Sequence, residues 1–367
     1  MMNMKRFFAG MAAALLAAVL FFPVKASAIS AESAILLDAN TGRVLYEKNA
    51  DRRSLIASTT KIMTALVVCE QCNVLDRVRI PQQAVGIEGS SMYLVAGEVL
   101  TVQDLLYGLM LHSGNDAAVA LAIYCGGTVE GFAELMNDKA QRLGMTNTHF
   151  VNPHGLDSPE HYSSARDMAI LTANAMNNPI FAQTVSTKTV RIGQRQLRNH
   201  NKLLWQIEGV DGVKTGYTRA AGRILISSAV RDDRRLIVVT INAPQDWTDH
   251  ACLIEQGFSR FNQRRLIEAG QILGSRPVLS GKQALSLVIS SQDFSYALAD
   301  DERVRIVLGG SETVFAPVYE GDDAGFAYVM LNDRVVGKVP LLYGQTVELK
   351  AAENTPFWRR RIGKGTP

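Results

Sequence analysis

The chain has 367 residues, of which 47% are hydrophobic and 20% are charged, with 38 lysines and arginines against 35 aspartates and glutamates. This composition is ordinary for a folded protein, and it excludes a disordered chain, a collagen-like repeat and a polytopic membrane protein. One or two domains with a large core are expected. The formal net charge of +3 is small, so the position of the charges matters more than their sum.

The excess positive charge lies at the N-terminus, in a segment typical of an export signal. Lys5 and Arg6 precede an uncharged apolar run at residues 7–22, and residues 26–28 (Ala-Ser-Ala) fit a cleavage site. The run is short for a bilayer span, which disfavours the alternative of a retained membrane helix. Removal of residues 1–28 would take away three basic residues and no acidic one, leaving 35 of each sign. Because nucleic-acid binding needs basic surface, no nucleic-acid partner is expected.

The first part of the remaining chain predicts a hairpin followed by helices. Residues 33–48 alternate apolar and polar positions around a turn at residues 39–42, the pattern of a β-hairpin. Helical periodicity follows at residues 58–68, where four apolar residues form one stripe: Ile62, Met63, Leu66 and Val67. Further helices are expected at residues 102–111, 116–124, 131–143 and 165–177.

Strand signals return later, at residues 209–215, 223–230 and 235–241, before a closing helix at residues 247–262. Strands at both ends of a helical middle predict an α/β (α+β) domain, with a mostly antiparallel sheet flanked by helices and a helical subdomain. Short strands then follow at residues 303–308, 313–318, 326–331 and 346–349, the pattern of a small all-β domain. The predicted parts are a signal peptide (1–28), a catalytic domain (29–266), a β-rich domain (267–352) and a basic tail (353–367).

Cysteines and histidines offer weak evidence for metal. The four cysteines are Cys69, Cys72, Cys125 and Cys252. The C-x-x-C pair lies in a helical stretch and no second pair completes a zinc set, so buried free thiols or one disulfide are expected. His154, Asp157 and His161 could supply ligands, but they lie in a stretch with the composition of a loop, and no H-E-x-x-H helix is present. No metal site is expected.

Ser58 and Lys61 form the first motif with chemical meaning, S-x-x-K. Residues three apart share a helix face, so the lysine amine can take the serine proton. The helix start stabilises negative charge on the serine, and desolvation or a second cation can keep the lysine neutral. Alone the motif is weak, because one chance match is expected in a chain of this length and a solvated helix lysine is the ordinary alternative.

Two further motifs strengthen this interpretation. Ser113 and Asn115 (S-G-N) lie between two predicted helices, where a loop with rigid ends can present a hydroxyl and an amide. Lys214, Thr215 and Gly216 (K-T-G) end a predicted strand, and the glycine leaves room for another backbone to approach. S-x-x-K, S-x-N and K-T-G each occur once, in that order. Together they predict a nucleophilic serine site.

The three motifs are those of penicillin-binding proteins and class A β-lactamases. The sequence resembles the serine-type D-alanyl-D-alanine carboxypeptidases, the low-molecular-mass penicillin-binding proteins, over residues 33–260. The resemblance includes the stretches ILLDANTGRVLYEKNAD, EGSSMYLVAGEVLTVQDLLYGLMLHSGNDAA, NPHGLDSPEHYSSARDMA and GVDGVKTGYTRAAGR. It implies a serine β-lactamase/penicillin-binding-protein-like fold, and the β-rich C-terminal region is similar to the second domain that many of these carboxypeptidases carry.

The resemblance implies a reaction. Ser58 would attack the carbonyl between two D-alanines of a peptidoglycan stem peptide, Lys61 would act as general base, and Ser113 would pass a proton to the leaving amine. The substrate-binding set would be Asn115, Lys214, Thr215, Gly216 and Tyr217. In that set Asn115 and Lys214 orient Ser113 and keep the site positive, and Thr215 binds the terminal carboxylate. The backbone N–H groups of Ser58 and Tyr217 would hold the oxyanion. β-Lactam antibiotics would acylate the same serine, and no metal or organic cofactor is needed.

One departure and several alternatives remain. Relatives often place an arginine after the strand that follows K-T-G, but residues 236–259 contain none, so carboxylate binding would fall to Thr215 and Lys214. A β-lactamase is disfavoured because no Glu-x-x-x-Asn lies between the second and third motifs, and a D,D-endopeptidase is chemically close. A non-catalytic cell-wall binding protein is disfavoured because all the motif residues are intact.

The tail and the location of the protein complete the predictions. Residues 357–361 pair aromatic and basic side chains, as interfacial membrane segments do. The stretch from Phe357 to Pro367 is short and its glycines and proline disfavour a helix, so a disordered basic tail is preferred and any membrane contact would be peripheral. We expect an exported, extracytoplasmic protein, in the cell wall or at the outer face of the cytoplasmic membrane.

Overall fold

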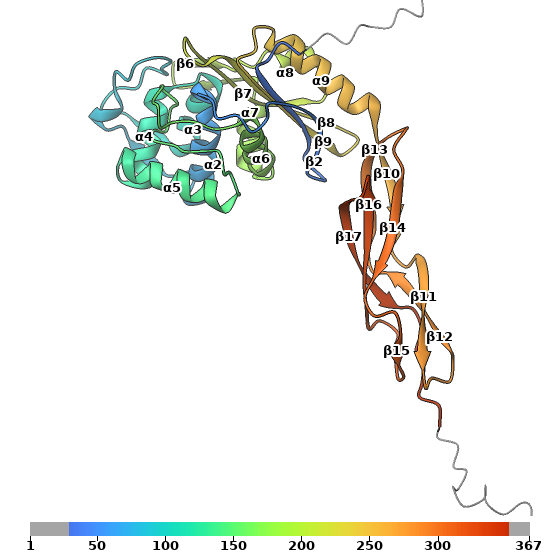
Figure 1. The fold of residues 1–367 in the computed structure, drawn as a ribbon. Helices are drawn as coiled ribbons and strands as arrows, with labels where there is room; N and C mark the ends of the chain where they lie inside the picture. The colour runs from blue at the N-terminus through green and yellow to red at the C-terminus, as the bar shows by residue number, and fades with distance from the viewer. Residues whose placement is uncertain (1–28, 352–367) are drawn as a thin grey trace, which may run out of the picture. The chain divides into compact units, whose positions relative to one another are not determined.

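The computed structural model describes residues 29–351, so the predicted signal peptide and the basic tail lie outside the described residues. The chain divides into two compact units (Figure 1). The first unit contains Tyr46–Ala229 and Ile237–Cys252 together with residues 29–35, and the second contains Leu36–Leu45, Val230–Leu236 and residues 253–351. The predicted α/β (α+β) architecture with a following all-β region is confirmed.

A five-stranded sheet has the order β2-β1-β9-β8-β7. Its strands are β1 (Ser33–Asp38), β2 (Arg43–Lys48), β7 (Val210–Thr218), β8 (Gly222–Arg231) and β9 (Arg234–Ile241). The predicted hairpin and the three predicted later strands are all present. β7 and β8 pair antiparallel, and β7 is the last strand in the order, so one of its edges is free for other contacts.

Along the chain, helices lie between the β1–β2 hairpin and the strands β7 to β9. They are η1 (Ala57–Thr60), α2 (Lys61–Gln71), η2 (Gln82–Ala84), α3 (Val102–Leu111), α4 (Asn115–Gly126), α5 (Val129–Arg142), α6 (Ala165–Ala175), α7 (Pro179–Ser186) and α8 (Leu203–Gln206). Two short strand pairs accompany them: β3 (Arg77–Arg79) with β4 (Val99–Thr101), and β5 (Thr189–Ile192) with β6 (Arg195–Arg198). Figure 1 shows α2 to α5 grouped together beside the sheet.

The central helix α2 is buried on every side from Lys61 to Cys69. The predicted apolar stripe of Ile62, Met63, Leu66 and Val67 is therefore inside, but so are the residues between these four. A helix that is apolar all round belongs in the centre of a domain. The predicted helix at residues 58–68 begins one residue earlier, as the 3₁₀ turn η1, which apolar spacing does not distinguish from an α-helix.

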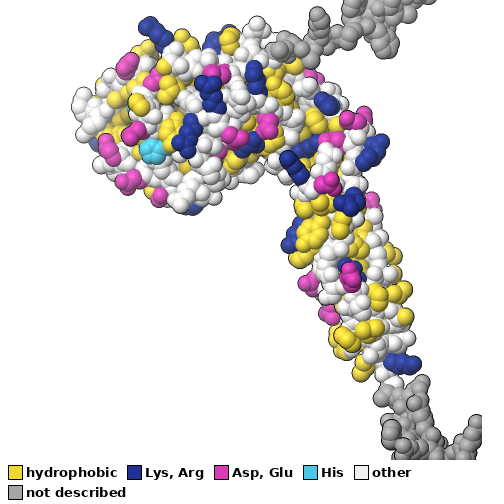
Figure 2. Space-filling model, in the orientation of Figure 1, with side chains coloured by type: hydrophobic (Ala, Val, Ile, Leu, Met, Phe, Trp, Pro, Cys, Tyr) yellow, Lys and Arg dark blue, Asp and Glu magenta, His cyan; other side chains and the backbone are white. Residues whose placement is uncertain are grey.

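Helix α9 (Asp246–Arg260) packs against the sheet through His250. The ring nitrogens of its buried His250 lie 2.8 Å from Ser227 Oγ on β8 and 2.9 Å from Thr240 Oγ1 on β9. Within residues 29–351 no single helix is long and apolar enough to cross a membrane; only the sharply bent pair α4–α5 has the length and composition. Figure 2 shows acidic and basic side chains interspersed over the visible face of the first unit.

The second unit contains the β-rich region. Its strands are β10 (Phe261–Ile267), β11 (Ile272–Leu279), β12 (Leu285–Ser290), β13 (Phe294–Ala299), β14 (Val304–Gly309), β15 (Val314–Phe315), β16 (Asp323–Leu331) and β17 (Arg334–Tyr343). β10 pairs with β13, and the other strands form a sheet in the order β14-β16-β17-β12-β11-β15. The strand predicted at 346–349 is wrong: this stretch makes only isolated bridges, at Val347 and Leu349.

Candidate active site

Ser58 and Lys61 lie at the junction between η1 and α2. The Nζ of Lys61 is 3.0 Å from Ser58 Oγ, because one 3₁₀-like turn brings residues three apart onto the same face. The residue before the serine, Ala57, has a φ of 45°, in the left-handed region that non-glycine residues rarely adopt. Such strained backbone is concentrated at functional sites.

Lys61 is fully buried, and three oxygens surround its amine. Besides Ser58 Oγ, these are Asn115 Oδ1 at 2.7 Å and the backbone carbonyl of His154 at 2.6 Å. Burial, and secondarily the charge of Lys214, lower the pKa of Lys61 well below its usual value. A neutral amine has two hydrogens and one lone pair. The amide and carbonyl oxygens can accept the two hydrogens, which leaves the lone pair for the Ser58 hydroxyl.

The second motif lies in the sharp break between α3 and α4. Ser113 has a φ of 62° and is 5% exposed, and Asn115 begins α4. The Asn115 N–H donates to Ser90 O at 2.7 Å, and its Nδ2 donates to Glu88 O. These two hydrogen bonds fix the Asn115 backbone and its side-chain amide, so that Oδ1 faces Lys61.

Asp116, which the sequence interpretation missed, fixes the neighbouring loop. Its buried carboxylate accepts hydrogen bonds from Ser91 Oγ at 2.6 Å, Met92 N at 3.1 Å and Leu94 N at 3.0 Å. An acidic residue in the first turn of a helix is a weak sequence signal, since it is common there for dipole reasons alone.

The third motif lies on the edge strand β7. Lys214 is 1% exposed, its Nζ donates to Thr215 O at 2.9 Å, and burial lowers its pKa to about 7. A Cβ at Gly216 would lie 3.3 Å from Ile56 O and from Thr59 N. Any side chain there would push β7 away from η1, so glycine allows the strand to approach the serine.

The Tyr217 N–H points away from β8. Tyr217 lies opposite Arg223, whose carbonyl accepts from Ala243 N at 2.9 Å and therefore points away from β7. Opposed residues of antiparallel strands either exchange both hydrogen bonds or neither, so Tyr217 and Arg223 exchange neither. The Tyr217 N–H is directed out of the free edge of β7. The Ser58 N–H belongs to the first turn of η1, where N–H groups have no partner within the helix.

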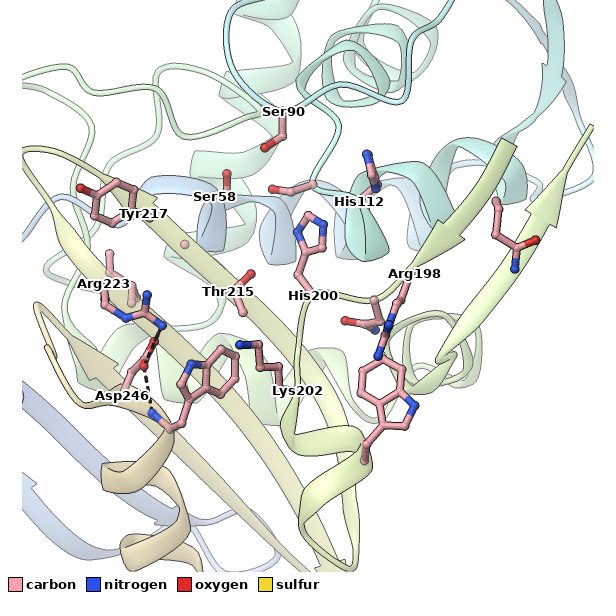
Figure 3. A pocket seen from close by; sticks show the side chains of 17 residues that line it. Ser58, Ser90, His112, Arg198, His200, Lys202, Thr215, Tyr217, Arg223 and Asp246 are labelled. Atoms are coloured by element: carbon pink, nitrogen blue, oxygen red, sulfur yellow. Dashed lines mark hydrogen bonds and ion pairs between the residues drawn. The ribbon is translucent and has the colours of Figure 1, made fainter. Parts of the chain in front are cut away.

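A cleft of about 810 Å³ joins these elements (Figure 3). The predicted residues that line it are Ser58, Ser113, Thr215, Gly216 and Tyr217, while Lys61, Asn115 and Lys214 are buried. The cleft continues along a wall that the sequence interpretation did not anticipate, made by Arg198, Lys202, Trp205, Arg223 and Trp247. All the predicted site residues therefore meet at or beneath one cleft.

The alternative metal ligands are engaged elsewhere. His161 is buried, with Nε2 at 2.8 Å from Thr60 Oγ1 and Nδ1 accepting from Val151 N, and Asp157 accepts from Thr218. Among the residues described, no group of three or more histidine, cysteine or acidic side chains could hold a metal ion.

The four cysteines, all within residues 29–351, form no disulfide in this structure. Burial raises the pKa of Cys69 to about 12, which makes this thiol unreactive.

Gly155 directly follows His154, whose backbone carbonyl accepts a hydrogen bond from Lys61. It has a φ of 87°, and a Cβ there would lie 1.9 Å from Ala57 O. We expect Gly155→Ala to lower the free energy of unfolding by about 2–4 kcal/mol, because strain and overpacking add. Gly144→Ala is the matched control, since Gly144 also has a positive φ but no atom near its Cβ position. It should cost only about 1 kcal/mol. Equal losses in denaturant unfolding would contradict the role of close packing at Gly155.

Known proteins are similar to this chain in sequence and fold. Residues 21–245 match the D-alanyl-D-alanine carboxypeptidase family, and residues 261–349 match the C-terminal domain of penicillin-binding protein 5. The chain is 33% identical over 352 residues to the D-alanyl-D-alanine carboxypeptidase DacF of Bacillus subtilis, a match that covers 92% of this chain and 90% of the relative.

Two solved structures are similar. Penicillin-binding protein 5 from Haemophilus influenzae has a TM-score of 0.75 and 32% identity, over 89% of this chain and 99% of that one. The Streptomyces K15 DD-transpeptidase has a TM-score of 0.61 and 34% identity, over 63% of this chain and 98% of that one.

Proposed function

The chain belongs to the D-alanyl-D-alanine carboxypeptidase family, and we propose that it removes the terminal D-alanine from peptidoglycan stem pentapeptides through an acyl-enzyme on Ser58. The observation that carries this proposal is the buried Lys61 amine, 3.0 Å from the serine hydroxyl. A buried lysine without a carboxylate partner is costly unless it is neutral, and a neutral lysine beside a serine is a general base.

In acylation, Ser58 Oγ attacks the carbonyl carbon of the penultimate D-alanine while Lys61 takes the hydroxyl proton. The Ser58 and Tyr217 N–H groups stabilise the oxyanion that forms, and preorganised donors of this kind are each worth about 3–4 kcal/mol. When the C–N bond breaks, the leaving amine gains a proton through Ser113. Free D-alanine departs, and the acyl group remains on the serine as an ester.

In deacylation a water molecule attacks this ester. Lys61, neutral again after the proton has passed to the leaving amine, takes a proton from the water and returns it to Ser58 Oγ. Asp246 is the only carboxylate that lines the cleft among the residues described, and its oxygens are bound to Arg223 and to Trp247 N. Within residues 29–351 no second carboxylate lines the cleft to activate water, which supports slow release of a β-lactam acyl group rather than β-lactamase activity.

The terminal carboxylate of the substrate would be bound by Thr215 and Lys214 on β7. Thr215 presents its hydroxyl to the cleft, with Lys214 directly behind the strand. Neither residue type requires a metal or an organic cofactor, and the steps above use none.

The reaction also fits a location. Relatives of this family act on peptidoglycan, outside the cytoplasm. We extend the proposal to export of this chain by residues 1–28 and to peripheral membrane contact by the basic tail, on the sequence patterns alone.

The test measures two products on one sample of purified protein. With a stem pentapeptide, D-alanine should be released stoichiometrically with tetrapeptide, and labelled penicillin should form a stable covalent adduct. Rapid penicillin hydrolysis without D-alanine release would show a β-lactamase instead. Cleavage of cross-linked stem dimers without D-alanine release from monomers would show an endopeptidase.

A further inference from the structure

The wall of the cleft beyond Thr215 contains charges that the proposed reaction does not use. Three cations, Arg198, Lys202 and Arg223, line it together with one carboxylate, Asp246. The leaving D-alanine carries a full negative charge that Thr215 alone cannot neutralise. Burial lowers the pKa of Lys214 to about 7, so its amine is only partly charged at neutral pH. A permanent cation is therefore missing from the carboxylate site as described so far.

Arg223 is the cation that the strand register brings beside Thr215. On β8, Arg223 lies opposite Tyr217 and Leu225 lies opposite Thr215. Opposed residues point to the same face, and so do residues two apart on one strand. Arg223 is thus a diagonal neighbour of Thr215 on the same face, a separation that a long side chain can span. In Figure 3 Arg223 lies below Tyr217 and to the left of Thr215, and its guanidinium is joined to Asp246.

The other two cations are directed elsewhere. The Arg198 guanidinium lies 5.0 Å from the ring centroid of Trp205, at the far end of the wall in Figure 3. Lys202 Nζ lies 5.9 Å from the ring of Trp247, which the Arg223 guanidinium approaches at 6.0 Å from its own side. Lys202 adds positive potential near Arg223 but comes from a different segment, directly before α8.

Asp246 orients Arg223 without saturating it. Nη2 of Arg223 donates to both Asp246 oxygens at 2.9 Å, and Asp246 Oδ1 also accepts from Trp247 N at 2.9 Å. The Asp246 side chain is 4% exposed and the Arg223 side chain 45%. Among residues 29–351, neither Nη1 nor Nε of Arg223 has a hydrogen-bond partner. A guanidinium held at one nitrogen keeps its remaining donors for a second carboxylate.

We propose that Arg223 pairs with the terminal carboxylate of the substrate, together with the Thr215 hydroxyl, and that Asp246 is the positioning residue for Arg223. This rests on the proposed function and supplies, from β8, the cation that residues 236–259 lack. The carboxylate would meet the Arg223 guanidinium, with the positive potential of Lys202 nearby, against the single charge of Asp246.

The test compares two forms of one substrate: the stem pentapeptide with a free C-terminal carboxylate, and the same peptide with a C-terminal carboxamide. For Arg223→Ala, kcat/KM on the carboxylate form should fall about 10- to 100-fold. The carboxamide form, already slow with the wild type, should change less than about 3-fold. Arg223→Lys should recover part of the loss, because it restores the charge without the fork geometry. Arg198→Ala is the matched control and should leave the carboxylate-to-carboxamide ratio unchanged.

Asp246→Asn tests the positioning role. It should raise KM for the carboxylate form several-fold with little change in kcat, while melting temperature and penicillin labelling stoichiometry stay near wild type. An unchanged carboxylate-to-carboxamide ratio in Arg223→Ala would overturn the proposal. Activity on both forms would then either be unaffected or fall by the same factor, and an equal fall would indicate a structural role. Failure of the wild type to release D-alanine from either form would instead overturn the proposed function.

Discussion

Replacing Ser58 by alanine should abolish covalent labelling by penicillin and lower D-alanine release by at least about 10⁴-fold, the scale on which removal of a nucleophile acts. The covalent intermediate needs the Oγ that lies 3.0 Å from Lys61 Nζ. The oxyanion N–H groups would persist in this variant, so weak substrate binding should survive. Intact-mass spectrometry after incubation with penicillin measures the adduct directly.

Ser90→Ala is the matched control for Ser58→Ala. Ser90 also presents a hydroxyl to the cleft, and its backbone carbonyl rather than its side chain accepts the Asn115 N–H. Loss of the Ser90 hydroxyl should leave labelling close to the wild-type rate. Adduct formation by Ser58→Ala would rule out Ser58 as the nucleophile, whereas loss of labelling in both variants would point to a general disturbance of the cleft.

The meeting of the three motifs at one cleft could be expected, because each motif has its own local geometry. Ser58 and Lys61 need only one helical turn to meet, and Gly216 signals a close approach of β7. Their convergence depends on the sheet order and on the packing of η1 against the edge strand. No single motif contains that information, so the joint occurrence of three motifs was the stronger evidence.

Other parts of the site left little trace in the sequence. The hydrogen bond from Lys61 to the His154 backbone carbonyl could not be predicted. Every residue carries such a carbonyl, so the sequence does not mark the one that binds. Arg223 lies on a predicted strand, but its face depends on a register that shifts between Val210 and Gly212. A one-residue change in register would turn every side chain to the other face. No strand is predicted where β10 to β13 lie, because apolar and polar residues do not alternate clearly in this stretch. Some of its exposed positions are apolar, such as Ile272 and Leu285.

Lys61→Met should lower the rate of acylation by penicillin about 10²- to 10⁴-fold, the usual contribution of a general base. Methionine fills similar buried volume without the amine. In the wild type the base is active when deprotonated. Because the pKa of Lys61 is lowered, its amine stays deprotonated at pH values well below the usual lysine pKa. The acylation rate of the wild type should therefore fall on the acid side as Lys61 gains a proton, and Lys61→Met should lack this limb.

The same substitution should change how stability depends on pH. Between the lowered pKa of folded Lys61 and its usual value near 10.5, the unfolded chain binds a proton that the folded chain does not, so this group makes stability rise with pH. The unfolding free energy of the wild type minus that of Lys61→Met should therefore rise with pH in that window, by up to about 1.4 kcal/mol per pH unit. Denaturant unfolding from pH 7 to 9.5 measures it. A flat difference would mean that Lys61 stays charged when folded, and a charged amine cannot take the Ser58 proton.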